Sequence, residues 1–564
     1  MKFGLSDLFI SVNRSRQIVF YVPFALLLCA VAGFFVEYKF MLQFKQSSPS
    51  VKLEGGNLNT LQRQLDNLLI RYKPFRACRD SVSASDPTRS KIQLKGNHVI
   101  NLGDTIRLNV ILFDGYGKAK STGGDHLRAR LFAYSFDAFA PCTVLDNRNG
   151  TYTVTAEALW TGWSKLEVDV LFPKEIIATA LRIRTTWDFS DIEVAFHNLN
   201  VFGTSMCNPN KVMLEKKSET DIICNFSYWN KTMPWFCAKP HGRNISCKHW
   251  VSIGRSWTNY TNTLSKCEQE LSGRANATIP TETFIKVLPI HSAHSQVTVD
   301  QPNIACADYN KSKLWYRLKP TGYFYNGTWI LRHCKGLSTF DGNCLRNKII
   351  YFWGDSTLQQ WLIYLKSILT FECKVVMKET RHWRMKKTCY CHQYNITLNW
   401  MPHNIPISNF SVENPMDFFS KTFCEEICNE RKDSDVILII TLYLHIQMYS
   451  PRFFALHMVE IRRCVESIFK NNLNVRVFIK LPHTHNKVKI KDVLIKQPDI
   501  IGYIFTDIIR KVFKGLYLKV IVLDNQDATR AVKNVPIHPG QIVVRAMVNQ
   551  FLSYICHDSK SSSV

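Results

Sequence analysis

Acidic side chains are scarce in this chain of 564 residues. Asp and Glu together number 45 against 71 Lys and Arg, which leaves a formal net charge of +26. In a cytosolic protein, this balance would first suggest a nucleic-acid partner. The membrane topology described next argues against nucleic acid, and favours anionic glycans or the acidic face of a partner protein. The alternative is a basic surface that is merely solvated.

Long apolar runs are scarce as well. Residues 18–36 form the single apolar, uncharged run that is long enough to span a bilayer. Lys2, Arg14 and Arg16 precede it, so the positive-inside rule places the N-terminus in the cytosol and the remainder on the lumenal side. No clean small-x-small cleavage site follows the run. This favours an uncleaved type II signal anchor over a cleaved signal peptide and a secreted product.

Cysteine, by contrast, is plentiful. Of eighteen cysteines, Cys29 alone lies in the apolar run, so seventeen face an oxidising compartment and most should be paired. The odd number implies a free thiol or an intermolecular bridge, and the spacing does not reveal the pairing. Sequons for N-glycosylation also fit a glycoprotein of the secretory pathway. They stand at Asn149, Asn225, Asn230, Asn244, Asn259, Asn276, Asn310, Asn326, Asn395 and Asn409.

The pattern along the chain predicts a multidomain α+β protein. Shifts in composition and periodicity separate seven segments. They are a cytosolic tail (1–17), the transmembrane signal anchor (18–36), a stem (37–85), an immunoglobulin-like β-sandwich (86–200), a cysteine-rich segment (201–314), a three-layer α/β domain (315–556) and a polar tail (557–564).

The segment 86–200 has the period-two pattern of β-strands. Ile106, Leu108 and Val110 alternate with polar residues, and the run stops at Asp114-Gly115. Several such runs with turn signals between them predict a sandwich. The turn and strand at 146–154 resemble filamin-type immunoglobulin-like modules. This segment has no catalytic constellation, so we expect it to act in binding or as a spacer.

The segment 201–314 shows little periodicity and predicts loops held by disulfides against the sandwich. Its cysteines are Cys207, Cys224, Cys237, Cys247, Cys267 and Cys306. A zinc site that includes His241 and His249 is the alternative. The oxidising compartment and the irregular spacing favour disulfide bridges.

The segment 315–556 alternates apolar strand runs with amphipathic helices, which predicts a parallel α/β sheet. We expect strands at 349–353, 435–444, 475–481 and 518–523, and a helical face made by Phe454, Met458, Ile461, Val465 and Ile468. Ligands of such sheets bind beyond the carboxyl ends of the strands. Four polar residues that are distant in sequence follow such ends, and we expect them to converge: Ser356, Asp524, Asp527 and His538.

Gly354, Asp355 and Ser356 lie between the first of these strands and a helix. A serine at such a turn can hold its hydroxyl out of the core, near backbone N–H groups that stabilise an oxyanion. The same three residues also make an ordinary N-cap and turn, which is the non-catalytic alternative.

Several short motifs stand in a recognisable order in this part of the chain. They are Gly322-Tyr323-Phe324, Trp329, Cys334, Leu345-Arg346-Asn347-Lys348-Ile349-Ile350, Gly354-Asp355-Ser356 and Cys556. This order resembles the PC-esterase domain, a branch of the SGNH/GDSL hydrolases that includes polysaccharide and sialate O-acetyltransferases. The sandwich and the cysteine-rich segment resemble neurexophilin. The whole arrangement is similar to the neurexophilin and PC-esterase domain family.

The resemblance implies that Ser356 is a nucleophile, with His538 as its general base and an aspartate that orients the histidine. Many SGNH enzymes carry this acid three residues before the histidine, where the present chain has Val535. Asp527 or Asp524 then supplies the carboxylate, or Ser356 and His538 act as a dyad.

The resemblance also implies oxyanion and support residues. Gly354 and Asp355 would support the nucleophile, and His445 or His483 would join the backbone N–H of Ser356 as a donor to the oxyanion. The family pattern leads us to expect a glycine and an asparagine near these two histidines, and this chain departs from it. A metal site at His483-Thr484-His485 is the alternative use of that pair, and we expect no metal.

We therefore expect a glycan O-acetyltransferase or esterase with its body in the Golgi lumen. It would form an acyl-serine and act on hydroxyls of sialic acid or of other glycoprotein glycans. It would hold no bound cofactor, and acetyl-CoA or another acyl donor would be its co-substrate. A single span provides no channel for the donor, so a transporter or partner is implied. The alternatives are an inactive neurexophilin-like glycoprotein that binds a protein through the sandwich, and a lumenal lipid or peptide hydrolase.

Overall fold

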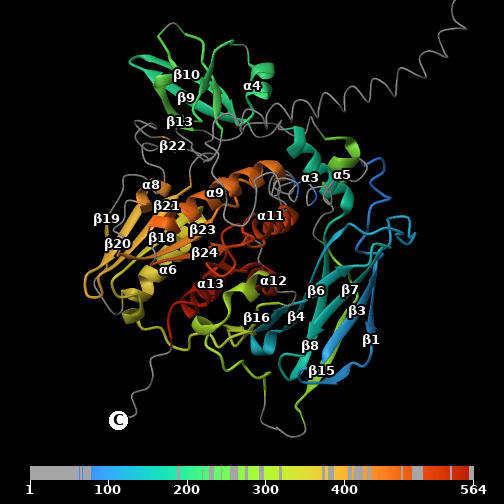
Figure 1. Cartoon of the computed structure of the whole chain (residues 1–564). Helices are drawn as coiled ribbons and strands as arrows, with labels where there is room; N and C mark the ends of the chain where they lie inside the picture. The colour runs from blue at the N-terminus through green and yellow to red at the C-terminus, as the bar shows by residue number, and fades with distance from the viewer. Residues whose placement is uncertain are drawn as a thin grey trace, which may run out of the picture. The chain divides into compact units, whose positions relative to one another are not determined.

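The computed structural model describes residues 63 and 67 and most of the range 78–557 (Figure 1). The gaps within this range are 187–190, 219, 228–233, 243, 254–263, 273–276, 291–296, 317–319, 371–374, 379–385, 404–409, 412–422, 429–432, 472–473, 486–498 and 534–535. Among the described residues, no helix is both long and apolar enough to cross a membrane. The predicted anchor at 18–36 and most of the predicted stem lie outside the described residues.

The described chain is mixed α and β, as predicted, and two of its sheets enclose one apolar core. The four-stranded sheet has the order β1 (Lys91–Lys95), β3 (Thr105–Ile111), β7 (Thr151–Glu157), β6 (Thr143–Asp146). The eight-stranded sheet has the order β17 (Thr328–Leu331), β16 (Gly322–Tyr325), β5 (Ala138–Pro141), β4 (His126–Ala133), β8 (Gly162–Phe172), β15 (Thr283–Leu288), β2 (Val99–Asn101), with β14 (Ala277–Thr278) beside β8.

The alternation in the sequence accounts for this core. Ile106, Leu108 and Val110 of β3 point inward, and Val168 of β8 meets them from the opposite sheet. Each buried side chain of this size stabilises the fold by roughly 1.5–3 kcal/mol relative to an exposed one. Charged and polar residues occupy the intervening positions of β3, which face solvent.

Strands from three predicted segments contribute to the eight-stranded sheet. β14 and β15 come from the predicted cysteine-rich segment, and β16 and β17 from the predicted α/β domain. Phe324 of β16 pairs with Phe139 of β5, which joins the last two strands to the sheet. Strands of two to six residues cannot bury an apolar face alone, so they complete an existing sheet. Backbone pairing in this sheet therefore joins strands from both sides of the predicted segment boundaries at 200 and 315.

A third sheet is built from the cysteine-rich segment and its neighbours. Its order is β11 (Ile223–Asn225), β12 (Phe236–Ala238), β10 (Val201–Asn208), β9 (Ile192–Asn198), β13 (Trp250–Ile253), β22 (Phe410–Ser411). Phe196, Trp235 and Trp250 belong to its small core. Two disulfides, Cys207–Cys237 and Cys224–Cys247, hold the strands together.

Disulfides connect much of the described chain, which confirms that most cysteines are paired. The other four bridges that the structure describes are Cys78–Cys267, Cys306–Cys334, Cys344–Cys556 and Cys424–Cys464. Free thiols among the described residues are Cys142, Cys389 and Cys428. Cys237 and Cys247, the cysteines near His241 and His249, are thus each in a disulfide, with Cys207 and Cys224 respectively.

The fourth sheet is the one that positions the candidate site. Its order is β19 (Val375–Lys378), β20 (Lys387–Cys391), β21 (Ile396–Pro402), β18 (Lys348–Gly354), β23 (Asp435–Thr441), β24 (Val475–Lys480), β25 (Val520–Leu523). The last five strands are parallel. In chain order their arrangement is 2-1-3-4-5, the doubly wound pattern with a switch point between its first and third strands. That point lies between β18 and β23.

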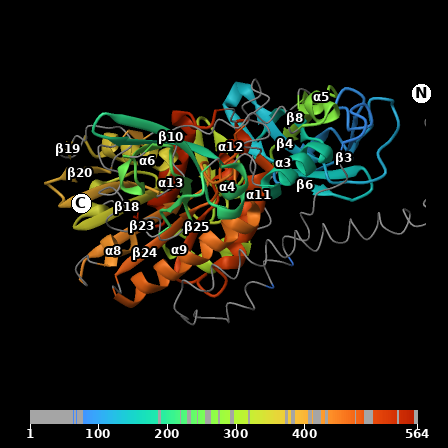
Figure 2. The ribbon, with the colours of Figure 1, turned by 90° about the horizontal axis from the view of Figure 1, so that it is seen from above.

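Helices cover both faces of this sheet (Figures 1 and 2). α6 (Ser356–Leu369) and α13 (Gln541–Ser553) lie on one face, where the rings of Trp361 and Phe551 are 6.0 Å apart. α9 (Pro451–Asn471) and α11 (Asp499–Val512) lie on the other. Phe454 of α9 belongs to the predicted helical face, which is buried as expected.

Shorter helices connect these layers. They are α3 (Lys174–Thr186), α4 (Lys211–Lys217), α5 (Lys266–Ser272), α8 (Phe423–Cys428) and α12 (Gln526–Ala531), with 3-10 turns η1 (Tyr134–Phe136), η2 (Cys247–His249), η4 (Cys306–Asp308), η5 (Lys311–Tyr316) and η6 (Gly342–Leu345).

Charged contacts fasten the eight-stranded sheet to the α/β region. Arg128 of β4 forms a buried ion pair with Asp499, the first residue of α11. Lys533, just beyond α12, bonds Glu167 at 2.7 Å and Asp169 at 2.9 Å, both on β8. These contacts neutralise charges that the fold removes from water.

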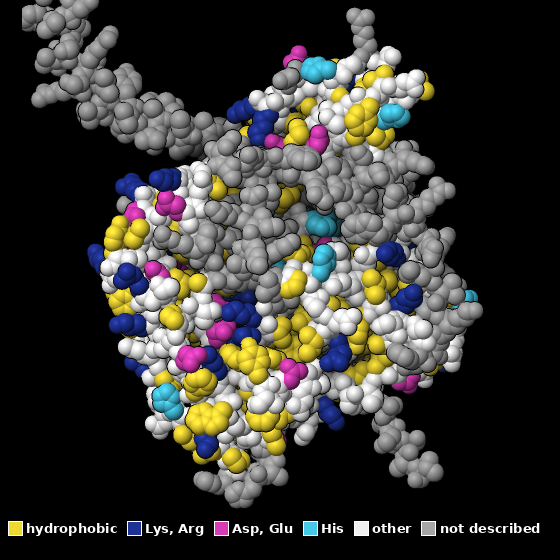
Figure 3. Space-filling view, turned by 180° about the vertical axis from the view of Figure 1, so that it is seen from behind, with side chains coloured by type: hydrophobic (Ala, Val, Ile, Leu, Met, Phe, Trp, Pro, Cys, Tyr) yellow, Lys and Arg dark blue, Asp and Glu magenta, His cyan; other side chains and the backbone are white. Residues whose placement is uncertain are grey.

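Basic side chains are spread over the described surface in Figure 3. Lys and Arg stand singly or in small groups among apolar and acidic side chains on that face. The view therefore shows a dispersed positive charge on the described residues of this face.

Candidate active site

Gly354 is required by the packing of the parallel sheet. It ends β18 directly beside Thr441 of β23, and a Cβ atom at this position would lie 2.1 Å from the Thr441 carbonyl oxygen. A backbone atom cannot yield by that much, so no larger residue fits here. The glycine brings the end of β18 close to β23 and thereby sets where the next two residues emerge.

Asp355 is the N-cap of α6 and is buried. Its Oδ1 accepts hydrogen bonds from the backbone N–H of Thr357 at 2.9 Å and from the Thr357 hydroxyl at 2.6 Å. Its Oδ2 accepts a hydrogen bond from the Leu444 N–H, 3.3 Å away, in the loop after β23. The aspartate of the motif thus caps the helix and ties the turn to the neighbouring strand end.

Burial raises the pKa of the Asp355 carboxyl, but nearby groups outweigh this effect and leave the pKa lowered. The most important of them is the positive charge of Lys480, followed by His445 and the hydrogen bond from Thr357. Asp355 is therefore ionised at neutral pH. It is a fixed negative charge beneath the turn that carries Ser356.

Ser356 is the first residue of α6 and remains partly exposed. Its Oγ lies 2.7 Å from Nε2 of His538, which is exposed in the loop between α12 and α13. The same loop is held against α6 because Gln360 Nε2 donates a hydrogen bond to the Pro539 carbonyl at 3.1 Å. A hydroxyl and an imidazole in this contact have the geometry of a nucleophile and its general base.

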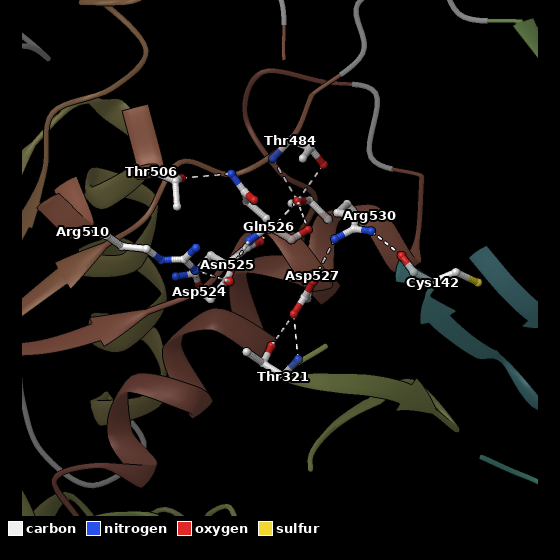
Figure 4. A network of polar contacts seen from close by, with 11 residues as sticks. Cys142, Thr321, Thr484, Thr506, Arg510, Asp524, Asn525, Gln526, Asp527 and Arg530 are labelled. Atoms are coloured by element: carbon white, nitrogen blue, oxygen red, sulfur yellow. Dashed lines mark hydrogen bonds and ion pairs between the residues drawn. The ribbon is translucent and has the colours of Figure 1, made fainter. Parts of the chain in front are cut away.

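Asp524 and Asp527 are engaged elsewhere in the fold (Figure 4). Asp527 Oδ2 accepts hydrogen bonds from the Thr321 N–H at 2.7 Å and from its hydroxyl at 3.1 Å, and Oδ1 accepts one from Arg530 at 3.3 Å. Asp524 accepts a hydrogen bond from the Gln526 N–H and lies 3.9 Å from Arg510. These contacts join the end of β25 and the start of α12 to α11 and to Thr321, the residue before β16.

Burial is the main cause that raises the pKa of Asp524 to about 6, and the negative charge of Asp527 adds to it. Neither carboxylate hydrogen-bonds His538. The structure therefore does not bring the predicted acids to the predicted base, because Thr321 and the two arginines engage the carboxylates instead.

The position three residues before the histidine, Val535, lies outside the described residues. Among the described residues, no acidic side chain hydrogen-bonds the Nδ1 atom of His538. What the structure assembles is a serine and histidine dyad, the alternative that the sequence left open.

His483 is buried, and both nitrogens of its ring are used within the protein. Nε2 lies 2.8 Å from the Ile537 carbonyl and Nδ1 lies 3.3 Å from Nζ of Lys480. The ring is therefore not an open donor for an oxyanion. Its neighbour in the motif, His485, is also buried. Its ring Nε2 lies 3.4 Å from Nε2 of Gln447, and its backbone N–H donates a hydrogen bond to Oδ1 of Asp499.

His445 pairs with a histidine that the sequence analysis missed. Its Nδ1 lies 2.8 Å from Nε2 of the buried His403, whose own backbone N–H donates to the Gly354 carbonyl at 3.3 Å. His403 follows β21, a parallel strand that we did not predict. Its position just after residues 396–402 is the signal that could have identified it, because functional residues of parallel sheets lie beyond the carboxyl ends of the strands.

Six of the ten sequon asparagines lie among the described residues, and each of the six is exposed. They are Asn149, Asn225, Asn244, Asn310, Asn326 and Asn395. The remaining four, Asn230, Asn259, Asn276 and Asn409, lie outside the described residues. The exposed six are accessible positions for glycans.

Comparison with known proteins identifies the region that carries the dyad. Residues 329–556 match the family model described as the C-terminal domain of NXPE family member 4-like proteins. This match confirms the family resemblance drawn from the sequence, and it covers both Ser356 and His538.

Solved structures add little. The chain is similar to a Lin-41 filamin domain, with 17% identity, 15% of this chain and 81% of that chain covered, and a TM-score of 0.14. It is also similar to invasin, a bacterial integrin-binding protein, with 8% identity, 57% of this chain and 60% of that chain covered, and a TM-score of 0.13. TM-scores this low carry no argument about the fold.

Proposed function

We propose that this chain transfers an acyl group to or from sugar hydroxyls through an acyl-serine, and the match of residues 329–556 to the NXPE C-terminal family model supports this. The observation that carries the proposal is the 2.7 Å contact between Ser356 Oγ and His538 Nε2. We assign the domain to the SGNH type, and the two sheets that precede it to an immunoglobulin-like, neurexophilin-like module.

The first half of the reaction forms the acyl-serine. His538 Nε2 takes the proton of the Ser356 hydroxyl while Oγ attacks the carbonyl carbon of the donor. The tetrahedral intermediate then collapses, the bond from acyl carbon to leaving group breaks, and the leaving group takes the proton from His538. In the second half, a sugar hydroxyl or water attacks the ester and loses its proton to His538, and Ser356 regains it.

The backbone N–H of Ser356 is the donor that this turn offers to the oxyanion. It belongs to the first turn of α6, where N–H groups have no partner within the helix. The neighbouring Thr357 N–H is already bonded to Asp355, so it does not serve. His445 directly follows Leu444, whose N–H binds Asp355, and we assign it as a supporting side chain on this side of the turn.

The exposure of His538 suits a large acceptor. A dyad at the surface can meet a glycan attached to a protein or lipid, whereas a buried one would need a small substrate. We assign sialic acid or another glycoprotein glycan as acceptor and acetyl as the acyl group, supplied by acetyl-CoA or a related donor. The chain would act in the Golgi lumen from a type II anchor at 18–36, with a partner or transporter for the donor.

A second function is favoured by one observation. No described carboxylate supports His538, as would fit a domain that has lost catalysis and binds a partner through the sandwich. The two functions differ in whether Ser356 matters, so a substitution at this residue separates them.

The test compares cells that produce the full chain with cells that produce Ser356→Ala. O-acetylation of cell-surface glycans is measured by mass spectrometry at matched protein level and glycoform. We expect a change in O-acetylated glycans in the first cells and the background profile in the second. Identical profiles at equal expression would remove the catalytic function and leave the binding function.

A further inference from the structure

We propose that Lys480 and His483 form a support that positions His538, and so serves the positioning role of a triad carboxylate. This inference rests on the proposed function of the dyad, and names the residues that hold its base. The support acts on the backbone next to His538, whereas a triad carboxylate would act on the imidazole itself.

The contact that defines the support is between His483 and the Ile537 carbonyl. His483 Nε2 lies 2.8 Å from that oxygen. A carbonyl can only accept, so Nε2 carries the proton and donates. Because His483 is almost fully buried, at 1% exposure, its ring has no alternative partner in solvent.

The other ring nitrogen fixes this tautomer. Lys480 Nζ lies 3.3 Å from His483 Nδ1, and an ammonium can only donate. Burial lowers the pKa of His483 well below its usual value, and the positive charge of Lys480 lowers it further. The imidazole is thus neutral, with its single proton directed at Ile537.

The support is anchored to the strand ends that carry the nucleophile. Lys480 ends β24, and its carbonyl accepts a hydrogen bond from the Thr441 hydroxyl at 3.1 Å. Thr441 in turn pairs with Gly354, two residues before Ser356. The nucleophile and the loop that carries its base are therefore both held by the ends of β18, β23 and β24, which belong to one sheet.

His538 lies between two residues whose carbonyl oxygens accept hydrogen bonds, Ile537 from His483 and Pro539 from Gln360. Its side chain is exposed, and the Gln360 bond to Pro539 holds only the residue that follows it. Without the bond to Ile537, one of the two bonds that flank His538 is lost, and the 2.7 Å contact to Ser356 would be populated less often.

The test uses two substitutions at His483 and one matched control in the purified glycoprotein. His483→Phe keeps the ring shape and removes the donor, whereas His483→Gln keeps an N–H at the position of Nε2. His485→Phe is the control, because His485 is a buried histidine of the same loop whose ring nitrogen lies 3.4 Å from Gln447. Phe keeps a ring at this position, and so keeps the edge-on packing against the His483 ring at 6.3 Å. Lys480→Met is measured alongside, so that the test survives if His483→Phe fails to fold.

Two quantities are measured for each variant. The first is amide hydrogen exchange within residues 536–540, followed at Ile537, His538 and Gly540 because Pro536 and Pro539 have no N–H. It reports the loop whether or not the protein is an enzyme. The second is labelling of Ser356 by a fluorophosphonate probe, resolved into the maximal labelling rate and the probe concentration that gives half of it. A misplaced base lowers the maximal rate, by about a hundredfold for a displacement near 1 Å, and leaves the half-saturating concentration unchanged.

We expect faster exchange of 536–540 and a lower maximal rate in His483→Phe, recovery of both in His483→Gln, a smaller change of the same sign in Lys480→Met, and wild-type values in His485→Phe. Wild-type exchange of this loop in both His483→Phe and Lys480→Met would overturn the support, even where labelling proceeds. Faster exchange in His483→Phe together with no labelling of any variant, including wild type, would instead uphold the support and overturn the proposed function.

Discussion

Ser356 Oγ and His538 Nε2 are 2.7 Å apart although the two residues are separated by 182 positions in the chain. The doubly wound order of the parallel strands brings them together. Ser356 follows the first strand, at the switch point, and His538 follows the last, and both strands end at the same edge of the sheet. The predictions below test whether this contact is catalytic and what supports it.

His538→Gln is expected to lower the rate at which Ser356 reacts with a fluorophosphonate by about 10²- to 10⁴-fold, the usual contribution of a general base. The fold should be unaffected, because the side chain is exposed. Labelling is followed by fluorescence and stability by thermal unfolding. His392→Gln, another exposed histidine, is the control. Equal labelling of His538→Gln and wild type would show that the contact has no catalytic role.

Asp527→Asn is expected to destabilise the fold without removing the reactivity of Ser356. The carboxylate accepts two bonds from Thr321 and one from Arg530, and none from His538. Loss of a buried charged acceptor costs about 1–3 kcal/mol. Denaturant unfolding measures the loss, and labelling is compared per folded molecule. A drop in labelling at unchanged stability would make Asp527 the catalytic acid after all.

Lys480 should make stability depend on pH in the alkaline range. Burial lowers its pKa to about 8, despite the opposing effect of Asp355, from the ordinary value of 10.5. Between these two values the unfolded chain binds a proton here that the folded chain does not, so this residue favours folding more as the pH rises. The unfolding free energy of wild type minus that of Lys480→Met should therefore increase from about pH 7.5 to about pH 9.5.

That difference is measured by denaturant unfolding of both proteins at the two pH values, where contributions from other groups largely cancel. A difference that stays constant, or falls with pH, would mean that Lys480 keeps an ordinary pKa in the folded protein.

Arg128→Met is expected to destabilise the whole described unit by about 3–5 kcal/mol, since it leaves Asp499 buried without its ion-pair partner. Asp499→Asn should do the same from the other side. The double variant should cost less than the sum of the two, because neither uncompensated charge remains. Strict additivity of the two losses would show that this pair does not couple the eight-stranded sheet to α11.

The sequence indicated the parallel strands well. The runs at 349–353, 435–444, 475–481 and 518–523 correspond to β18, β23, β24 and β25, because strands buried on both faces are continuously apolar. It also placed Ser356 and His538 at strand ends, from which their proximity follows. The local sequence pattern was sufficient to predict a strand wherever burial alone determines which residue types occur in it.

Pairing between distant segments was not predictable in the same way. β16 joins the eight-stranded sheet through Phe324 and Phe139, and no periodicity within either strand names its partner. The direction of the Asp527 side chain is similarly decided by Thr321, far away in sequence. A strand-end position indicated that Asp527 lies near the catalytic edge, but the hydrogen-bond partners that hold it away from His538 appear only in three dimensions.

Two buried residues near the dyad, His403 and Lys480, were not predicted for a related reason. His403 follows a strand, β21, that is flanked by polar and aromatic residues and was therefore not recognised. Lys480 lies inside the run predicted at 475–481, and the sequence gives no sign that this charged residue is buried. The side chain is instead buried. The carboxylate of Asp355 stabilises its positive charge, and Nδ1 of His483 accepts its hydrogen bond.

The most direct test of the central claim is the site of covalent labelling by a fluorophosphonate. The purified protein is treated with the probe, digested and mapped by mass spectrometry, alongside Ser356→Ala. The account predicts one adduct, on Ser356, that is lost in Ser356→Ala and formed more slowly in His538→Gln. An unlabelled wild type, or an adduct that persists at another residue in Ser356→Ala, would contradict it.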